Sequence, residues 1–220
     1  MNRDYAAHFF RWGFATNFVR AGMNVLDVGC GVEQQLVKVL LKSLTYVPKL
    51  YVGVDLNKIG KPTKIAWTRT HDEFDFTSRW KELADEYGLF DVIVNYEMIE
   101  HMEVKDARKL LRGMRALLRP GTGRLLLSTP VYNNIHMAAN HIHEYGFDEL
   151  RQELTNADFE VERVHGTFMT ANAMKKVMNP TEKALVEELH KFHPWEVLAN
   201  FLAPKYPQAA SNCCWVLRRA

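Results

Sequence analysis

Short apolar runs alternate with longer amphipathic stretches along most of this chain. Runs rich in valine, leucine and isoleucine between turn residues predict strands, whereas apolar residues spaced three or four apart predict helices. We expect strands at 24–28, 50–55, 64–69, 90–95 and 123–130. We expect helices at 5–19, 36–41, 78–87 and 104–118. Strands that alternate with helices in this order indicate a parallel sheet with helices on both faces.

The last third of the chain predicts two further strands, at 159–164 and 213–217, after a helix at 148–155. The segment between these strands, 165–211, is far longer than an ordinary connection. Within it, Asn179, Pro180 and Glu182 stand in the order that starts a helix. The apolar residues that follow on one face of this helix are Leu185, Leu189 and Phe192. We therefore expect a helical insertion or lid, with a dimer contact as the alternative.

Residues 1–220 are expected to form a single domain, in which residues 1–20 supply a leading helix. Aromatic residues at helical spacing make this leading segment amphipathic. Two interpretations of it remain open. The helix either closes over a bound ligand or only covers the sheet.

Residues that could bind a ligand lie where the predicted strands end. The first strand runs into the turn Gly29-Cys30-Gly31, and glycine lets a ligand lie against bare backbone at the carboxyl edge of such a sheet. A dinucleotide fingerprint needs a third glycine, where this chain has Gln34, so a nicotinamide-dependent dehydrogenase is not favoured. Asp27 would repel a pyrophosphate but suits a ligand that bears an ammonium group.

The second strand also ends in a carboxylate, Asp55. Two carboxylate oxygens match the two neighbouring hydroxyls of a ribose, which supports a nucleoside ligand. The alternative is that Asp55 only caps the turn that follows.

The stretch 25–31, VLDVGCG, resembles motif I of the class I S-adenosylmethionine-dependent methyltransferases. This chain departs from the usual motif by having Glu33 where the family prefers glycine. The turn Arg119-Pro120-Gly121 resembles a second family segment, which precedes the fifth strand. The resemblance implies a Rossmann-like α/β fold with a seven-stranded, mostly parallel sheet and an antiparallel final strand. It also implies S-adenosylmethionine as the cofactor.

The resemblance extends to the residues that would hold this cofactor. An acidic residue after the third strand contacts the adenine amine in the family, which points to Asp75 followed by Phe76, with Asp72 as the competing choice. The segment after the fourth strand would line the methionine end. The expected cofactor site comprises Asp27, Gly29, Cys30, Gly31, Asp55, Leu56, Asp75, Phe76, Asn95, Tyr96 and Glu97.

Methyl transfer mainly requires that the acceptor be held in line with the methyl group, and a hydroxyl acceptor also benefits from a base. Three histidines, His136, His141 and His143, follow the fifth strand. We predict that His143 or His141 contacts the acceptor, and an extended segment would place both on one face. The alternatives are ordinary loop residues or a metal site of His141, His143 and Glu144; we expect no metal.

Glu100 and His101 follow the fourth strand, where this pair resembles the small-molecule branch of the family. The alternative role for the pair is a capped or ion-paired helix start.

The composition of the chain limits the classes of partner that it is expected to bind. The formal net charge of +2 gives no electrostatic case for nucleic acid, and 47% hydrophobic residues suffice for one core. The three cysteines form no disulfide framework, and neither a signal peptide nor a membrane-spanning stretch is visible, so a cytoplasmic location is expected. We expect a small-molecule acceptor, with a homodimer as an open option.

The expected function is methyl transfer to an oxygen or nitrogen of a small or medium-sized acceptor, such as a metabolite or a sugar. One alternative is a methyltransferase that acts on nucleic acid or a modified nucleotide, although the motif for base N-methylation is missing from the segment that begins at Asn95. The other alternative is a binding protein that kept the fold and lost the reaction.

Overall fold

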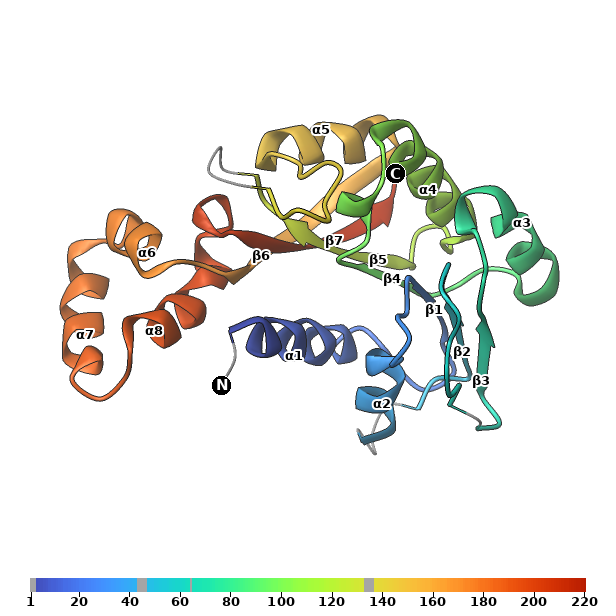
Figure 1. The fold of residues 1–220 in the computed structure, drawn as a ribbon, viewed down its shortest axis with the longest axis horizontal. Coiled ribbons are helices and arrows are strands. Elements are labelled where there is room, and N and C mark those ends of the chain that lie inside the picture. The colour runs from blue at the N-terminus through green and yellow to red at the C-terminus, as the bar shows by residue number, and fades with distance from the viewer. Residues whose placement is uncertain (1–2, 43–46, 64, 133–136) are drawn as a thin grey trace.

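The computed structural model describes residues 3–42, 47–63, 65–132 and 137–220. Seven strands in this part of the chain form one sheet, in the order β3-β2-β1-β4-β5-β7-β6 (Figure 1). The strands β1 to β5 are mutually parallel, and β7 is antiparallel to both β5 and β6. The predicted α/β fold with an antiparallel final strand is thereby confirmed. The strands are β1 (Asn24–Val28), β2 (Leu50–Val54), β3 (Thr68–His71), β4 (Val92–Tyr96), β5 (Arg124–Pro130), β6 (Phe159–Phe168) and β7 (Asn212–Arg219).

Helices cover both faces of the sheet, because buried side chains alternate between two cores along each strand. In β1, Leu26 and Val28 face one core and Val25 faces the other. Figure 1 shows α1 on one face, with α4 and α5 on the opposite face. The helices around the sheet are α1 (Arg3–Thr16), α2 (Gln35–Lys42), α3 (Phe76–Tyr87), α4 (Val104–Leu117) and α5 (Phe147–Asn156).

Three predicted boundaries differ from the structure by three or four residues. The third strand begins at Thr68 and not at residue 64, because the Thr68 hydroxyl donates 2.6 Å to the carbonyl of Thr63 and holds residues 65–67 in a turn; Lys64 lies outside the described residues. The sixth strand continues to Phe168, since it pairs with β7 along its whole length. The leading helix ends at Thr16, where the Thr16 hydroxyl bonds back to the carbonyl of Gly13.

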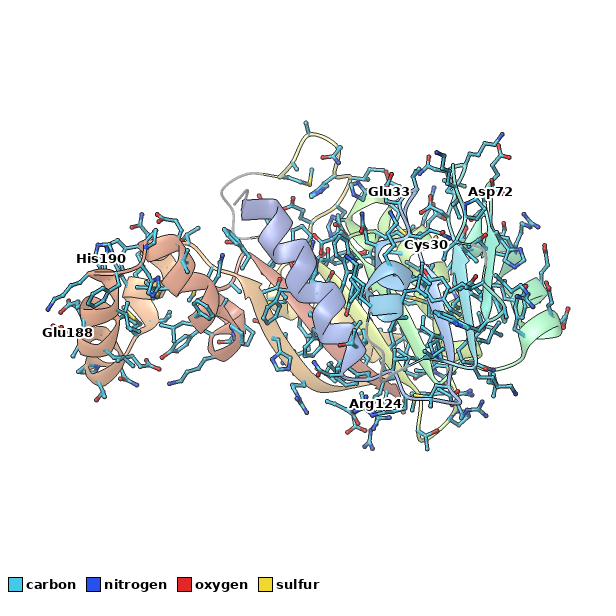
Figure 2. All side chains as sticks on the ribbon, turned by 90° about the horizontal axis from the view of Figure 1, so that it is seen from below. Cys30, Glu33, Asp72, Arg124, Glu188 and His190 are labelled. Carbon is cyan, nitrogen blue, oxygen red and sulfur yellow. The ribbon has the colours of Figure 1, made fainter. Side chains whose placement is uncertain are left out.

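The predicted insertion forms three helices with a small core of their own. They are α6 (Ala171–Val177), α7 (Pro180–His190) and α8 (Trp195–Leu202). The buried members of this core include Met174, Val186 and Leu198. Figure 2 places these helices, marked by Glu188 and His190, at the opposite end of the molecule from Asp72.

The apolar face that the sequence places on α7 points to solvent. Leu185 and Leu189 are 59% and 39% exposed, because α7 packs through the neighbouring Val186, and Phe192, which follows the end of α7, is 80% exposed. Among the described residues, no helix combines the length and the apolar character needed to cross a membrane.

Gly166 on β6 is where the insertion meets the sheet. A Cβ atom at this position would lie 2.3 Å from the carbonyl oxygen of Ala203 and 2.7 Å from the Cβ atom of Ala210. Ala203 belongs to a short 3-10 helix, η2 (Ala203–Lys205), that continues α8. Backbone and a short side chain have little freedom to retreat, so the close approach depends on glycine.

We predict that Gly166→Ala lowers the free energy of unfolding by about 1–3 kcal/mol, because overpacking forces the backbone to shift. Gly13→Ala is the matched control: its added methyl meets nothing within 4 Å in α1, and alanine should stabilise the helix by about 0.5–1 kcal/mol. Chemical denaturation measures both. Equal effects of the two substitutions would contradict this account.

Candidate functional site

The glycine turn after β1 is hydrogen-bonded to the end of β2. The amides of Gly29 and Cys30 both donate to the carbonyl of Val54, at 2.9 and 3.1 Å, and the Gly31 amide donates 2.8 Å to a carboxylate oxygen of Asp55. Gly29 and Gly31 have φ of 77° and 71°, which strongly favours glycine. A Cβ atom on Gly29 would also lie 2.8 Å from the sulfur of Met98. Both predicted glycines are therefore required by the turn itself.

Asp27 lies buried beneath this turn and is 5% exposed. It accepts a 2.7 Å hydrogen bond from the hydroxyl of Tyr51, which is itself fully buried. Burial raises the pKa of Asp27 to about 7, while the Tyr51 hydrogen bond opposes the rise and the charge of Asp55 adds to it. The site thus holds a carboxyl group that gains its negative charge near neutral pH, and a positively charged ligand would favour that charge.

Asp55 follows β2 and is 8% exposed. One of its oxygens accepts from the Gly31 amide, and the other accepts from the amide and side chain of Asn57 at 2.8 and 3.1 Å. The Asp55 carboxylate therefore caps the turn that follows it, as the alternative interpretation expected. It also lies at the end of the second strand, as predicted. Its role toward a ribose remains a prediction.

The departure from glycine at Glu33 leaves the turn intact. The Glu33 carboxylate pairs with Lys38 at 2.7 Å, and its side chain is 71% exposed. The positive φ falls on the next residue instead, Gln34, at 48°. Gln34 is 1% exposed and accepts a 2.8 Å hydrogen bond from the amide of Thr63. Figure 2 shows Glu33 and Asp72 at one edge of the sheet and Arg124, which begins β5, at the opposite edge.

Two cavities meet at Gly29. The larger, about 300 Å³, extends from the glycine turn towards α1, and this volume lies at the lower limit for ligand pockets. Its lining includes Trp12, Asp27, Gly29, Cys30, Gly31, Gln34, Tyr96 and Glu97. The smaller, about 70 Å³, runs between the ends of β1, β2 and β3. Its lining includes Gly29, Asp55, Leu56, Asp75, Phe76, Met98 and Met102.

The structure thus brings ten of the eleven predicted cofactor residues to the walls of adjoining cavities. Cys30 is buried, and burial raises the pKa of its thiol. The exception is Asn95, which is fully buried. Its amide nitrogen donates 2.9 Å to the Val28 carbonyl and lies 3.0 Å from the sulfur of Met98. Asn95 therefore fixes the end of β1 and the side chain that covers Gly29.

Asp75 has a structural role that the sequence interpretation missed. It is the N-cap of α3, and its carboxylate accepts from the Thr77 amide and from the hydroxyls of Thr77 and Ser78, at 2.7–2.9 Å. The Thr77 hydroxyl contributes most to the lowered pKa of Asp75. The predicted start of the helix at residue 78 was too late, because the cap places it at Phe76. The sequence Asp-Phe-Thr-Ser carried this signal.

Glu97 joins the site to the leading helix. It has a φ of 52° at the end of β4, an unusual conformation for a side-chain-bearing residue. Its carboxylate accepts 2.7 Å from the Ser128 hydroxyl and 2.9 Å from the amide nitrogen of Asn212. Arg11 of α1, 3% exposed, lies 3.5 Å from the same carboxylate.

Trp12, next to Arg11 on α1, lines the larger cavity. The contacts of Arg11 and Trp12 favour the interpretation that the leading helix closes over a ligand. Sequence spacing named neither residue as a site residue, although both lie on the predicted leading helix.

The two predicted catalytic histidines have different partners. His141 Nδ1 lies 2.5 Å from a carboxylate oxygen of Glu144, and its ring meets that of His101 edge to face. His143 Nε2 lies 2.8 Å from Glu149. The segment that carries both histidines is not a strand, and its amides at 142 and 143 both donate to the Glu100 carbonyl. A contact of either histidine with the acceptor remains a prediction. His136 lies outside the described residues.

Comparison with known proteins agrees with this geometry. The sequence model of a family described as "Methyltransferase domain" matches residues 5–187. The chain belongs to this family. The match begins in the leading helix and continues into α7, so it includes the whole turn and both cavities. The methyltransferase sheet and its glycine turn agree with the resemblance to class I enzymes.

Curated relatives of this methyltransferase chain are O-methyltransferases by name. The ubiquinone biosynthesis O-methyltransferase of Xanthomonas euvesicatoria pv. vesicatoria (strain 85-10) is 32% identical over 118 residues, covering 52% of this chain and 46% of the relative. That of Rhodopseudomonas palustris (strain BisB5) is 27% identical over 128 residues, covering 58% and 47%. The chain spans about half the length of the curated relatives it matches.

Solved structures share the fold of this methyltransferase chain. A SAM-dependent methyltransferase from Archaeoglobus fulgidus matches with a TM-score of 0.63 at 13% identity, covering 99% of this chain and 95% of the other. CalO1, a methyltransferase in calicheamicin biosynthesis crystallised with SAH, gives 0.58 at 17%, covering 98% and 54%. The [4+2]-cyclase SpnF gives 0.61 at 16%, covering 94% and 79%. Because a cyclase shares this fold, likeness of fold alone does not fix the reaction.

We predict that Tyr51→Phe destabilises the protein more at pH 8 than at pH 5. The pKa of Asp27 in the folded protein, about 7, exceeds the ordinary value of 3.8 for an aspartate. Between these values the folded protein keeps a proton that the unfolded chain releases, so the contribution of Asp27 to stability falls as pH rises through this range. Above pH 7 the buried carboxylate is charged and depends most on the Tyr51 hydroxyl.

The expected loss in unfolding free energy is about 1 kcal/mol at pH 5 and about 2–3 kcal/mol at pH 8, since hydrogen bonds to charged groups are the stronger ones. Urea denaturation at both pH values measures it. Tyr132→Phe, at an exposed tyrosine, is the control and should change little. A loss that is the same at both pH values would refute the charged state assigned to Asp27.

Proposed function

We propose that this chain binds S-adenosylmethionine across the two cavities at Gly29 and transfers its methyl group to an oxygen of a small-molecule acceptor. The observation that carries the proposal is the pair of cavities that share Gly29, with Asp27 lining one and Asp55 the other. Membership of the methyltransferase domain family and the names of the O-methyltransferase relatives support the reaction and the choice of oxygen.

The residues fit the parts of this cofactor. Asp55 presents acceptors beside the smaller cavity, as two ribose hydroxyls require. Phe74 and Phe76 supply apolar surface for a base in the same cavity. Asp27, Tyr96 and Glu97 line the larger cavity, where their oxygens suit the ammonium of the methionine end. Glu33, at the position where the family prefers glycine, also lines the larger cavity, and its carboxylate is paired with Lys38.

The bound cofactor supplies a methyl group on a sulfonium, which is the electrophile of the reaction. In the proposed transfer the acceptor oxygen would form the new bond to carbon while the carbon–sulfur bond broke with its electron pair passing to sulfur, and S-adenosylhomocysteine would be left. The hydroxyl proton leaves the acceptor. The protein's task is to hold the acceptor in line and to exclude water, and α1 covers this side through Trp12 and Arg11.

His143 is our candidate for receiving the proton. A carboxylate oxygen of Glu149 faces His143 Nε2 at 2.8 Å, so this nitrogen carries the hydrogen and Nδ1 keeps a free lone pair. A carboxylate that orients a histidine in this way is typical of general bases. The His143 side chain is 34% exposed and lies on the segment that follows β5.

We predict that the full chain binds S-adenosylhomocysteine in isothermal titration calorimetry and that Asp55→Asn weakens binding roughly 10- to 100-fold. This range corresponds to the loss of one hydrogen bond to a charged acceptor, which is worth about 1.5–3 kcal/mol. Asp85→Asn makes the same chemical change at an exposed position of α3 and should leave affinity unchanged. The proposal fails if the wild-type chain shows no binding, or if Asp55→Asn binds as tightly as Asp85→Asn.

A further inference from the structure

A second group of side chains lies at the carboxyl edge of the sheet, beside the cavities but outside their walls. It comprises Glu100 and His101 of the 3-10 helix η1 (Ile99–His101), which follows β4, and His141 from the segment after β5. One potential ligand atom from each residue lies within 4.8 Å of the other two. Figure 1 shows the segments before α4 and α5 side by side at this edge.

Glu100 has a buried carboxyl group, and only one of its two oxygens has a hydrogen-bond partner in the described part of the chain. It is 0% exposed, and its Oε2 accepts a 3.0 Å hydrogen bond from the Thr129 hydroxyl, whereas its buried Oε1 has no hydrogen-bond partner in the described part of the chain. Burial raises the pKa of Glu100, and the charge of Glu97 raises it further. A buried oxygen without a partner is destabilising, so such an oxygen calls for an explanation.

Both histidines are oriented through their Nδ1 atoms. His101 Nδ1 lies 2.9 Å from the backbone carbonyl of Asn140, and His141 Nδ1 lies 2.5 Å from a carboxylate oxygen of Glu144. A carbonyl or an ionised carboxylate only accepts, so the hydrogen of each neutral ring sits on Nδ1 and the lone pair on Nε2. A histidine whose other nitrogen donates to a carboxylate or carbonyl is the usual arrangement of a metal ligand.

The backbone holds the three residues together. The carbonyl of Glu100 accepts from the amides of Ile142 and His143, at 2.8 and 3.1 Å, which fixes the segment carrying His141 against η1. Glu100 is buried, His101 is exposed and His141 is intermediate, so the group opens to solvent on one side. Atoms bound to one ion at about 2.1 Å lie no more than about 4.2 Å apart. The three residues must therefore move slightly closer together when an ion binds, and His101 is the exposed member of the group.

We propose that Glu100, His101 and His141 form a binding site for a divalent first-row transition-metal ion. Two imidazoles and one carboxylate favour ions such as Zn²⁺, Co²⁺ or Mn²⁺ over Mg²⁺ and Ca²⁺, which prefer oxygen ligands. This set differs from His141, His143 and Glu144, the alternative raised by sequence spacing. In the structure, Glu144 contacts Nδ1 of His141 and so orients this ring, and His143 pairs with Glu149.

Three protein ligands leave a coordination position open, as in catalytic metal sites. An acceptor oxygen bound there would be oriented towards the cofactor and would lose its proton more readily. This use of the site rests on the proposed function. The binding of the ion does not, because it needs neither cofactor nor acceptor.

The test is a titration of the metal-free, tag-free full chain with Co²⁺, followed by the visible absorption of the bound ion. We expect one equivalent to bind and Zn²⁺ to displace it. Glu100→Gln and His141→Ala should each weaken Co²⁺ binding by more than 100-fold. Glu144→Gln, which removes only the support of His141, should weaken it about 10- to 100-fold. His193→Ala, at an exposed histidine of the insertion, should bind as the wild type does.

Circular dichroism melts establish that each variant is folded. The isosteric Glu100→Gln and Glu144→Gln keep the test decisive if His141→Ala unfolds. Lack of Co²⁺ binding by the wild type, or unchanged binding by Glu100→Gln, overturns the metal site. Calorimetry with S-adenosylhomocysteine on the same preparation separates the two proposals: a chain that binds the nucleoside but not Co²⁺ refutes only the metal site, and the reverse result refutes only the cofactor site.

Discussion

The hydrogen bonds between the glycine turn and the end of β2 are the constraint on which the site depends. They hold Gly29 and Cys30 against the Val54 carbonyl and Gly31 against Asp55, so the backbone of one strand end is shaped by the next. The positive φ of both glycines follows from this closure. Asp27, buried below, has a raised pKa because burial disfavours its charged form, and the hydrogen bond from Tyr51 opposes part of this rise. The hydrogen-bonded turn thus accounts both for the backbone conformation at this edge of the sheet and for the burial that raises the pKa of Asp27.

The adjoining strands add a second polar layer. Glu97, at the end of β4, contacts Ser128 of β5, Asn212 of β7 and Arg11 of the leading helix. Glu100, one turn further on, anchors the segment after β5 through its backbone carbonyl. Cofactor, acceptor and ion would therefore meet at strand ends whose positions are set by the buried sheet. The helical insertion keeps its own small core and stands apart from this edge (Figure 1).

Much of the fold was predictable because burial and turn chemistry are local. The apolar runs located the seven strands, and Gly29, Gly31 and Asp55 stood out because turns and strand ends have characteristic residues. The start of β3 was missed because it depends on a hydrogen bond between Thr68 and Thr63. The group of Glu100, His101 and His141 could not be read from spacing, since loops after different strands bring it together. Unpartnered atoms, such as Glu100 Oε1, appear only in three dimensions.

A crystal structure of the full chain with S-adenosylhomocysteine tests the central claim most directly. The account predicts density for the nucleoside in the smaller cavity, with its two ribose hydroxyls donating to Asp55, and for the amino acid end in the larger cavity near Asp27 and Tyr96. The two parts should cross at Gly29. Density at another place on the molecule, or a bound nucleoside whose ribose makes no contact with Asp55, would contradict it.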